Sequence, residues 1–233
     1  MRVITILLLL SGCLLMTACS TTRNLPAGEK LYVGADVDLN GPDLTARQKK
    51  TLRNDLEGLT RPRPNSRLLG IPIKLSFYNM FYKSKPGSFF GKIRDKFGEP
   101  PVLGSQFDLQ KNVDLLDNYL ENKGFFKAVV KGDTVVKRKK MRAKFDVETG
   151  YQYKINAVHF PADSSDLSTY IRNSAAQTIL RPGEGFDLDV IKGERIRIDA
   201  FLKERGFYFF SPEYLLVQTD STIGGNLVNM HVV

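Results

Sequence analysis

Residues 120–126 read LENKGFF, and residues 202–208 repeat this stretch as LKERGFY. In each copy a run with helical spacing ends at a glycine, Gly124 or Gly206, and an aromatic pair opens the segment that follows. Glycine often closes a helix because its backbone enters the left-handed conformation without strain. The stretch therefore predicts two helices that end in the same way, each followed by extended chain.

The flanks of the two stretches repeat as well. Phe-Asp-Leu opens both helices, at residues 107–109 and 186–188, and the second helix is longer by about one turn. Asp108 stands at the N-cap position of the first helix, and Leu109 and Val113 begin its apolar face. Strand-like runs follow the helices at residues 125–136, 142–148, 207–219 and 226–233. This internal repeat predicts two copies of one structural unit.

A strand and another helix precede each of these long helices. In the first copy, residues 31–39 alternate as a strand and residues 43–57 form a helix. In the second copy, the corresponding strand covers residues 151–160 and the helix residues 166–180. Each copy therefore has the order strand, helix, helix, strand, strand, which predicts an α+β fold.

We expect the first domain at residues 31–149 and the second at residues 150–233. Residues 61–104 are an insertion in the first domain, and four prolines between residues 62 and 86 exclude one long regular element there. A short helix at residues 73–82 fits inside the insertion. The sequence stops at Val233 within a strand-like run, so we expect a truncated last strand and a longer native protein.

Residues 1–18 have the features of a lipoprotein signal peptide. Arg2 supplies the positive charge, and the apolar run after it is shorter than the roughly 20 residues of a membrane-spanning helix. Residues 16–19, Met-Thr-Ala-Cys, resemble a lipobox. Cys19 then becomes the acylated first residue of the mature chain, and residues 19–30 form a tether. A plain signal peptide with an incidental cysteine is the alternative.

Cysteine use agrees with lipidation. Cys13 and Cys19 are the only cysteines, so processing leaves no thiol for a disulfide. One acyl chain alone holds a protein only marginally at a membrane, so we expect a triacylated anchor. Ser20 follows Cys19, and no acidic residue stands at this position. The predicted localisation is the outer membrane, with the chain facing the periplasm.

Basic residues are concentrated in residues 61–98. The formal net charge of the chain is +9, and this segment holds nine basic residues against one acidic residue, Asp95. Aromatic side chains are interleaved with the cations, and this asymmetry indicates a local surface function. The candidate membrane- or partner-contact residues are Arg61, Arg63, Arg67, Lys74, Tyr78, Phe81, Tyr82, Lys83, Lys85, Phe89, Phe90, Lys92, Arg94 and Lys96.

The same segment has three interpretations. Aromatic and basic side chains favour a membrane surface with anionic headgroups. They also suit nucleic acid, but export argues against that partner. In the third interpretation the aromatic residues pack a small satellite core and the cations are only solvated.

The sequence contains no recognisable catalytic or metal-binding motif. His159 and His231 lie in separate strand-like runs, and no Cys/His cluster is present. Asp187 and Asp189 are explained by the first turn of a helix. We therefore expect no enzyme activity and no cofactor.

The repeat resembles a known family. Residues 120–126 and 202–208 are similar to the helix ends of POTRA domains, which lie on the periplasmic side of the BamA/TamA superfamily of outer-membrane assembly proteins. Residues 147–155, VETGYQYKI, resemble the link between successive domains. A lipobox cysteine followed by NLPAGEKLY at residues 24–32 resembles TamL-type, lipid-anchored TamA-like proteins of Bacteroidota. The RPRPN and GEPPV motifs of the insertion are similar to that family too.

The resemblance implies a non-catalytic module that binds polypeptides and positions a downstream β-barrel. Its partners would be unfolded outer-membrane proteins, a TamB-like protein and the membrane, through the lipid anchor, with no nucleic acid. An extended client adds a strand to an open sheet edge, and the candidate edges are residues 125–136 and 207–219. The alternative is a stand-alone outer-membrane lipoprotein that serves as a scaffold or a ligand-binding module.

Overall fold

The structure is a computed structural model that describes residues 21–233. The predicted signal peptide and Cys19 lie outside the described residues. The described chain forms two compact units, each assembled from three segments. The first contains the described residues up to 38 with 52–115 and 131–146, and the second contains 39–51, 116–130 and 147–233. The two domains predicted at 31–149 and 150–233 stay a prediction.

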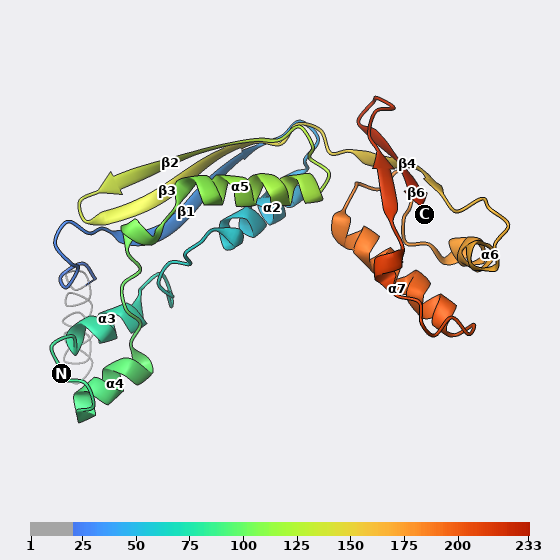
Figure 1. The fold of residues 1–233 in the computed structure, drawn as a ribbon. Coiled ribbons are helices and arrows are strands. Elements are labelled where there is room, and N and C mark those ends of the chain that lie inside the picture. Colours follow the sequence, from blue (N-terminus) through green and yellow to red (C-terminus); the bar gives the residue numbers. More distant parts are fainter. Residues whose placement is uncertain (1–20) are drawn as a thin grey trace, which may run out of the picture. The chain divides into compact units, whose positions relative to one another are not determined.

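The first sheet has three strands in the order β1-β3-β2, with helices α2 and α5 running along one of its faces (Figure 1). Alternate side chains of β3, among them Ala143 and Phe145, are fully buried. A Cβ on Gly132 would lie 2.9 Å from Leu109 and 3.0 Å from Val113, so the β2 backbone packs directly on α5. The elements are β1 (Leu31–Asn40), α2 (Ala46–Leu59), α5 (Leu109–Asn122), β2 (Val129–Lys137) and β3 (Lys140–Glu148).

The insertion forms two short helices and a 3-10 turn: α3 (Ile73–Met80), α4 (Phe89–Phe97) and η1 (Gly104–Gln106). Two buried asparagines fix its ends. Asn112 accepts from the Arg61 backbone N–H at 2.7 Å and donates to the Arg61 carbonyl at 2.7 Å. Asn65 bridges forward, donating to the Pro100 carbonyl and accepting from the Val102 N–H. The predicted helix at 73–82 is confirmed, whereas α4 is an element that the sequence analysis missed.

The second sheet repeats the strand order of the first, as β4-β6-β5. β6 is the central strand, parallel to β4 and antiparallel to β5, and its fully buried residues Val228 and Met230 join a core that includes Ile191. Both copies thus have the predicted β-α-α-β-β order of an α+β fold. The elements are β4 (Lys154–His159), α6 (Asp166–Asn173), η2 (Ser174–Gln177), α7 (Leu188–Lys203), η3 (Pro212–Tyr214), β5 (Val217–Asp220) and β6 (Leu227–Val232).

The predicted helix ends are confirmed. Gly124 has φ +82° and Gly206 has φ +98°, both in the left-handed region that favours glycine. Asp108 accepts from the Lys111 N–H at 3.1 Å, and Asp187 from the Asp189 N–H at 2.9 Å. Each long helix therefore begins at an aspartate cap and ends at a glycine, as the repeat predicts.

Three predicted strands are too long. The run at 151–160 is a strand only as β4, from residue 154 to residue 159. The run at 125–136 becomes β2 only from residue 129, after a turn in which Ala128 N–H bonds the Phe125 carbonyl. The run at 207–219 becomes β5 only from residue 217. The reason is Pro212, which starts a 3-10 turn. The Ser211 hydroxyl caps this turn by accepting from the Glu213 N–H.

Candidate functional site

A sheet edge admits an extended peptide only where its backbone N–H and C=O groups are free. Each sheet of this chain has two outer strands, β1 and β2 in the first and β4 and β5 in the second. Their outer hydrogen-bonding groups decide which edge is available.

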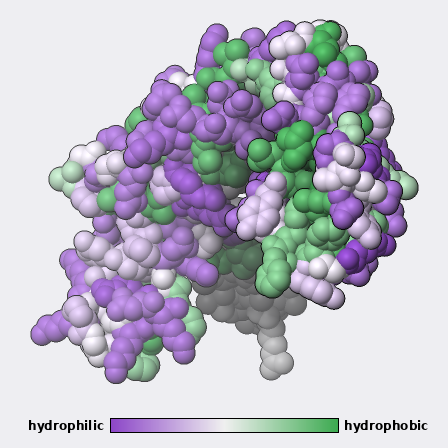
Figure 2. All heavy atoms as spheres, turned by 45° about the vertical axis from the view of Figure 1, so that its right-hand side comes forward, coloured by the Kyte–Doolittle hydropathy of each residue, from purple (hydrophilic) through white to green (hydrophobic). Residues whose placement is uncertain are grey.

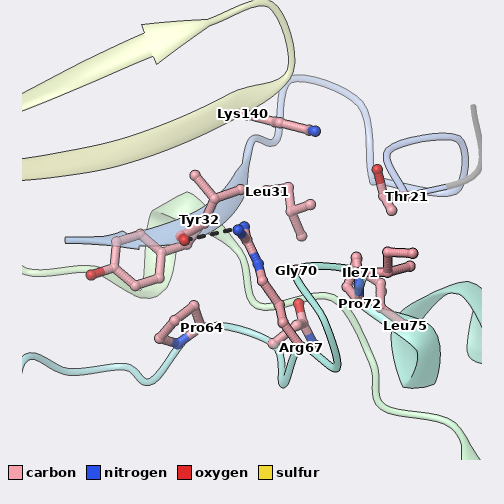
Figure 3. Close-up of a pocket in the computed structure, with 12 residues that line it drawn as sticks. Thr21, Leu31, Tyr32, Pro64, Arg67, Gly70, Ile71, Pro72, Leu75 and Lys140 are labelled. Atoms are coloured by element: carbon pink, nitrogen blue, oxygen red, sulfur yellow. Dashed lines mark hydrogen bonds between the residues drawn. The ribbon is translucent and has the colours of Figure 1, made fainter. Parts of the chain in front are cut away.

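The outer edge of β1 is capped within its own unit. The Tyr32 N–H donates to the Val102 carbonyl at 2.8 Å. The Val37 N–H donates to the Glu57 carboxylate at 3.2 Å. The Arg67 guanidinium donates to the Val33 carbonyl at 3.4 Å, as the dashed line in Figure 3 shows. An added strand would have to displace these partners.

In the second sheet, β4 is also covered. The Ile155 N–H donates to the Glu184 carbonyl at 2.9 Å, and the Gly183 N–H donates to the Ile155 carbonyl at 2.7 Å. No strand of the described chain pairs with the outer side of β5, but β5 is only four residues long. This edge therefore offers few backbone groups.

β2 provides the longest free edge. It has nine residues and no proline, and within residues 21–233 no other segment pairs with its outer side. The Thr134 N–H donates to the neighbouring Asp133 carboxylate at 2.7 Å. Val129 and Val135 are 49% and 42% exposed, so the strand also offers apolar side chains. Both sequence-predicted edges lie at sheet edges, and length favours β2.

The aromatic residues of the insertion form a ring cluster between α3 and α4. Phe81 packs edge-on against Phe77, with centroids 5.2 Å apart, and stacks on Phe90 at 5.4 Å. The cluster does not bury its outer members, because Phe89 is 72% exposed and Phe90 54%. Met80 is 72% exposed. The insertion therefore combines a small core with an apolar surface.

The basic residues of the insertion divide into two groups. Arg61 is structural, since its guanidinium donates to carbonyls at the end of α2, including Leu59 at 2.8 Å. Arg94 is structural too, bonded to Asp95 and to the carbonyls of Tyr82 and Ser84, and the first of these bonds raises its pKa. The exposed cations are Arg63, Arg67, Lys74, Lys83, Lys85, Lys92 and Lys96.

Exposed apolar residues are not confined to the insertion. The face drawn in Figure 2 shows hydrophobic patches among hydrophilic residues. In the second unit, Phe209 is 97% exposed and Tyr214 71%. Exposure alone therefore does not single out the insertion, whose distinction is its excess of basic residues, nine against one acidic residue at 61–98.

A pocket of about 240 Å³ lies where the tether, the start of β1 and the loop before α3 converge (Figure 3). Leu31, Ile71 and Leu75 supply apolar wall, and Thr21 and Lys140 are among its polar lining. Arg67 spans it toward β1. Nothing in the sequence pattern indicates this pocket, because its lining comes from four separate segments.

The four titratable residues that the sequence singled out, Asp187, Asp189, His159 and His231, make contacts within the fold. Lys123 donates to Asp187 at 2.9 Å and to Asp189 at 3.0 Å. Burial lowers the pKa of Lys123, but these carboxylates outweigh it and leave the pKa raised. His159 and His231 stack at 4.7 Å on neighbouring strands, a juxtaposition that the sequence did not reveal. The absence of enzyme activity stays a prediction.

Among residues 21–233, no cluster of three or more His, Cys, Asp or Glu side chains is suited to hold a metal ion. None of the helices in the described part of the chain has the length and apolar character needed to cross a bilayer.

No model of a known protein family matches this sequence, and no curated protein matches it either. In structure the chain is similar to POTRA3-5 of Haemophilus influenzae BamA, with a TM-score of 0.44 and 18% identity over 90% of this chain and 68% of that one. It is also similar to POTRA1-2 of the periplasmic domain of Omp85 from Anabaena, with a TM-score of 0.37 and 14% identity over 88% and 94% of the two chains. At these values the likeness carries no argument, and the description of the two units rests on their strand order and helix placement.

Proposed function

We propose that this chain is a periplasmic POTRA module of a lipid-anchored outer-membrane protein assembly factor, and that it binds client or partner polypeptides by adding a strand to β2. The observation that carries the proposal is the free outer edge of β2. The opposite edge of the same sheet, β1, is capped by the side chains of Glu57 and Arg67. Backbone hydrogen bonds recognise any extended segment, so a client needs no fixed sequence. Unfolded outer-membrane proteins have this property, and a TamB-like protein is a second partner of the same kind.

The Thr134→Pro substitution tests the edge. Thr134 N–H has no strand partner, so proline removes an outward donor and obstructs pairing while the bonds to β3 remain. Losing one or two backbone hydrogen bonds is expected to weaken client binding by about tenfold. The measurement is photo-crosslinking of an unfolded outer-membrane protein to a probe placed in β2.

Two further variants serve as controls for the edge. Thr134→Ala keeps the N–H and should bind as the parent chain does. Thr219→Pro places the same ring in β5 and should leave crosslinking to β2 unchanged. Equal binding by the Thr134→Pro chain, with circular dichroism showing an intact fold, would refute β-augmentation at β2 and favour the stand-alone scaffold.

We also propose that the α3–α4 insertion contacts the membrane surface. Its exposed rings lie among exposed lysines, including Lys83, Lys85 and Lys92. Aromatic rings favour the interface and cations favour anionic headgroups. The tether reaches this element directly, because Asn24 donates to the Asn79 carbonyl at 3.1 Å. The predicted lipid acceptor, Cys19, precedes that tether in the chain.

Replacing Phe89 and Phe90 together with serine is expected to lower binding to neutral phosphatidylcholine vesicles by at least about tenfold. Each fully buried phenylalanine contributes about 1.5–3 kcal/mol, and an interfacial ring gains part of that. Phe209→Ser is the matched control, since Phe209 is 97% exposed but lies outside the insertion. Vesicle co-sedimentation measures the effect, and equal losses in both variants would refute a specific role for α3–α4.

A further inference from the structure

The solvent face of the first sheet carries a second pocket, at the end where β2 turns into β3. Its volume is about 660 Å³, and the tether and all three strands contribute to its lining. Thr21, Thr22, Val33 and Val135 form part of the wall. The rest of the lining is basic: Lys137, Arg138, Lys139, Lys140, Arg142 and Lys144. Among residues 21–233, no acidic residue lines this pocket.

Strand alternation places these cations together. Ala143 and Phe145 of β3 are fully buried. Because successive side chains of a strand point to opposite faces, Arg142 and Lys144 lie on the solvent face. Val135 and Lys137 of β2 are exposed on the same pocket wall.

The positive charge of the pocket is largely uncompensated. Arg142 pairs with Asp36. Within residues 21–233, the other five basic side chains of the lining make no ion pair. Cations held this closely repel one another, so the pocket favours an anion that neutralises several of them.

One of the basic turn residues has a positive φ. Arg138 is the first turn residue and has φ +58°, in the region that glycine and asparagine prefer. A side chain with a Cβ is strained in this conformation. The chain nevertheless places a guanidinium at this position, next to three lysines.

We propose that this pocket binds the phosphate group of an anionic membrane lipid. Phosphate is the anion whose several oxygens suit a ring of lysine and arginine donors. Thr21 and Thr22 in the pocket wall stand two and three residues after Cys19. Two residues span at most about 7 Å, so lipidation of Cys19 holds the pocket against the bilayer. The choice of a lipid source rests on that predicted anchor, and the charge argument does not.

The test uses the mature chain, residues 19–233, with Cys19→Ser to remove the predicted acyl site. The vesicles contain phosphatidylcholine and about one third phosphatidylglycerol, which gives them a negative surface. Vesicle binding of this chain is compared with that of the triple variant Lys137→Gln, Lys140→Gln and Lys144→Gln. A lysine near an anionic surface contributes roughly fivefold to binding, so the triple variant is expected to bind on the order of 100-fold more weakly. Lys144→Gln alone is expected to lose about fivefold.

The control variant Lys50→Gln, Lys127→Gln and Lys192→Gln removes the same charge from exposed lysines outside the pocket. It is expected to bind within a few-fold of the parent chain, because distant charges are screened. An equal loss in both triple variants would overturn the pocket as the site. Inorganic phosphate added at the concentration of the lipid phosphate is expected to leave the protein on the vesicles. Full release would assign the pocket to a soluble phosphate and overturn the lipid as ligand. These results do not depend on client binding at β2, which the Thr134→Pro chain tests separately.

Discussion

Replacing Glu194 with alanine is expected to lower the free energy of unfolding by about 3–5 kcal/mol. Glu194 is fully buried in α7 and accepts four hydrogen bonds. Two come from the Arg197 guanidinium, at 2.7 and 2.9 Å, and the others from the Thr178 hydroxyl and the Ile179 N–H. Alanine removes the carboxylate and leaves a mostly buried guanidinium without its counterion. Urea denaturation at neutral pH measures the loss.

Glu204→Ala is the matched control, because this glutamate follows the same helix and its side chain is 75% exposed. It should change stability by less than about 0.5 kcal/mol. Similar losses in the two variants would show that the buried ion pair contributes nothing beyond helix propensity.

The pH dependence of Glu194 has a definite sign. Burial raises its pKa, but the bonds from Arg197, Ile179 and Thr178 outweigh burial and leave the pKa lowered. A group with a lowered folded pKa stabilises the fold above its unfolded pKa, which is about 4.3. That contribution is lost as the pH falls through the folded value. The stability difference between the parent and Glu194→Gln should therefore shrink below about pH 4, and a constant difference would contradict the assignment.

Gly124→Ala is expected to cost about 2–5 kcal/mol, whereas Gly206→Ala is expected to cost only about 1–2 kcal/mol. Both glycines have positive φ, and an alanine would be strained in this left-handed conformation at either site. At Gly124 the new Cβ would also lie 2.9 Å from the Cβ and the carbonyl oxygen of Phe186, whereas nothing lies within 4 Å at Gly206. Overpacking of this kind adds about 1–3 kcal/mol.

The clash at Gly124 involves backbone that cannot rotate away. The Gly124 carbonyl accepts from the Tyr153 N–H at 2.9 Å, and the Tyr153 carbonyl accepts from the Phe186 N–H at 2.7 Å. Relief of the contact would therefore stretch both bonds. Thermal or urea unfolding of the two alanine variants gives the comparison. Equal losses at the two glycines would mean that the contact with Phe186 relaxes freely.

The elements that the sequence predicted best are those with local signals. The aspartate caps, the terminal glycines and the apolar face of α5 are set by residues within one or two turns of each other. The repeat then predicts that both copies share one topology, and the common strand order confirms it. Helix α4 was missed because proline and glycine at residues 86 and 87 suggest an irregular segment, although Ser88 caps the helix by accepting from the Gly91 N–H.

The site required information that no local pattern holds. Which edge stays open depends on Glu57 and Arg67, which reach β1 from positions 20 and 34 residues away in the sequence. The sequence did not predict the basic pocket at the β2–β3 turn, because the run at 137–140 has the composition of an ordinary exposed turn. Alternation along β3 adds Arg142 and Lys144 to this pocket, and the sequence does not show which face of the strand is exposed.

The free edge of β2 has a further consequence, for self-association. Two copies that met edge to edge in an antiparallel pair centred on Thr134 would place Lys131 of one chain opposite Lys137 of the other, at both ends of the contact. Like charges directly opposite one another are destabilising. Lysines on an exposed edge also discourage aggregation in natural sheets. The β2 edge can therefore accept an extended client segment, while Lys131 and Lys137 oppose edge-to-edge pairing between two copies of this chain.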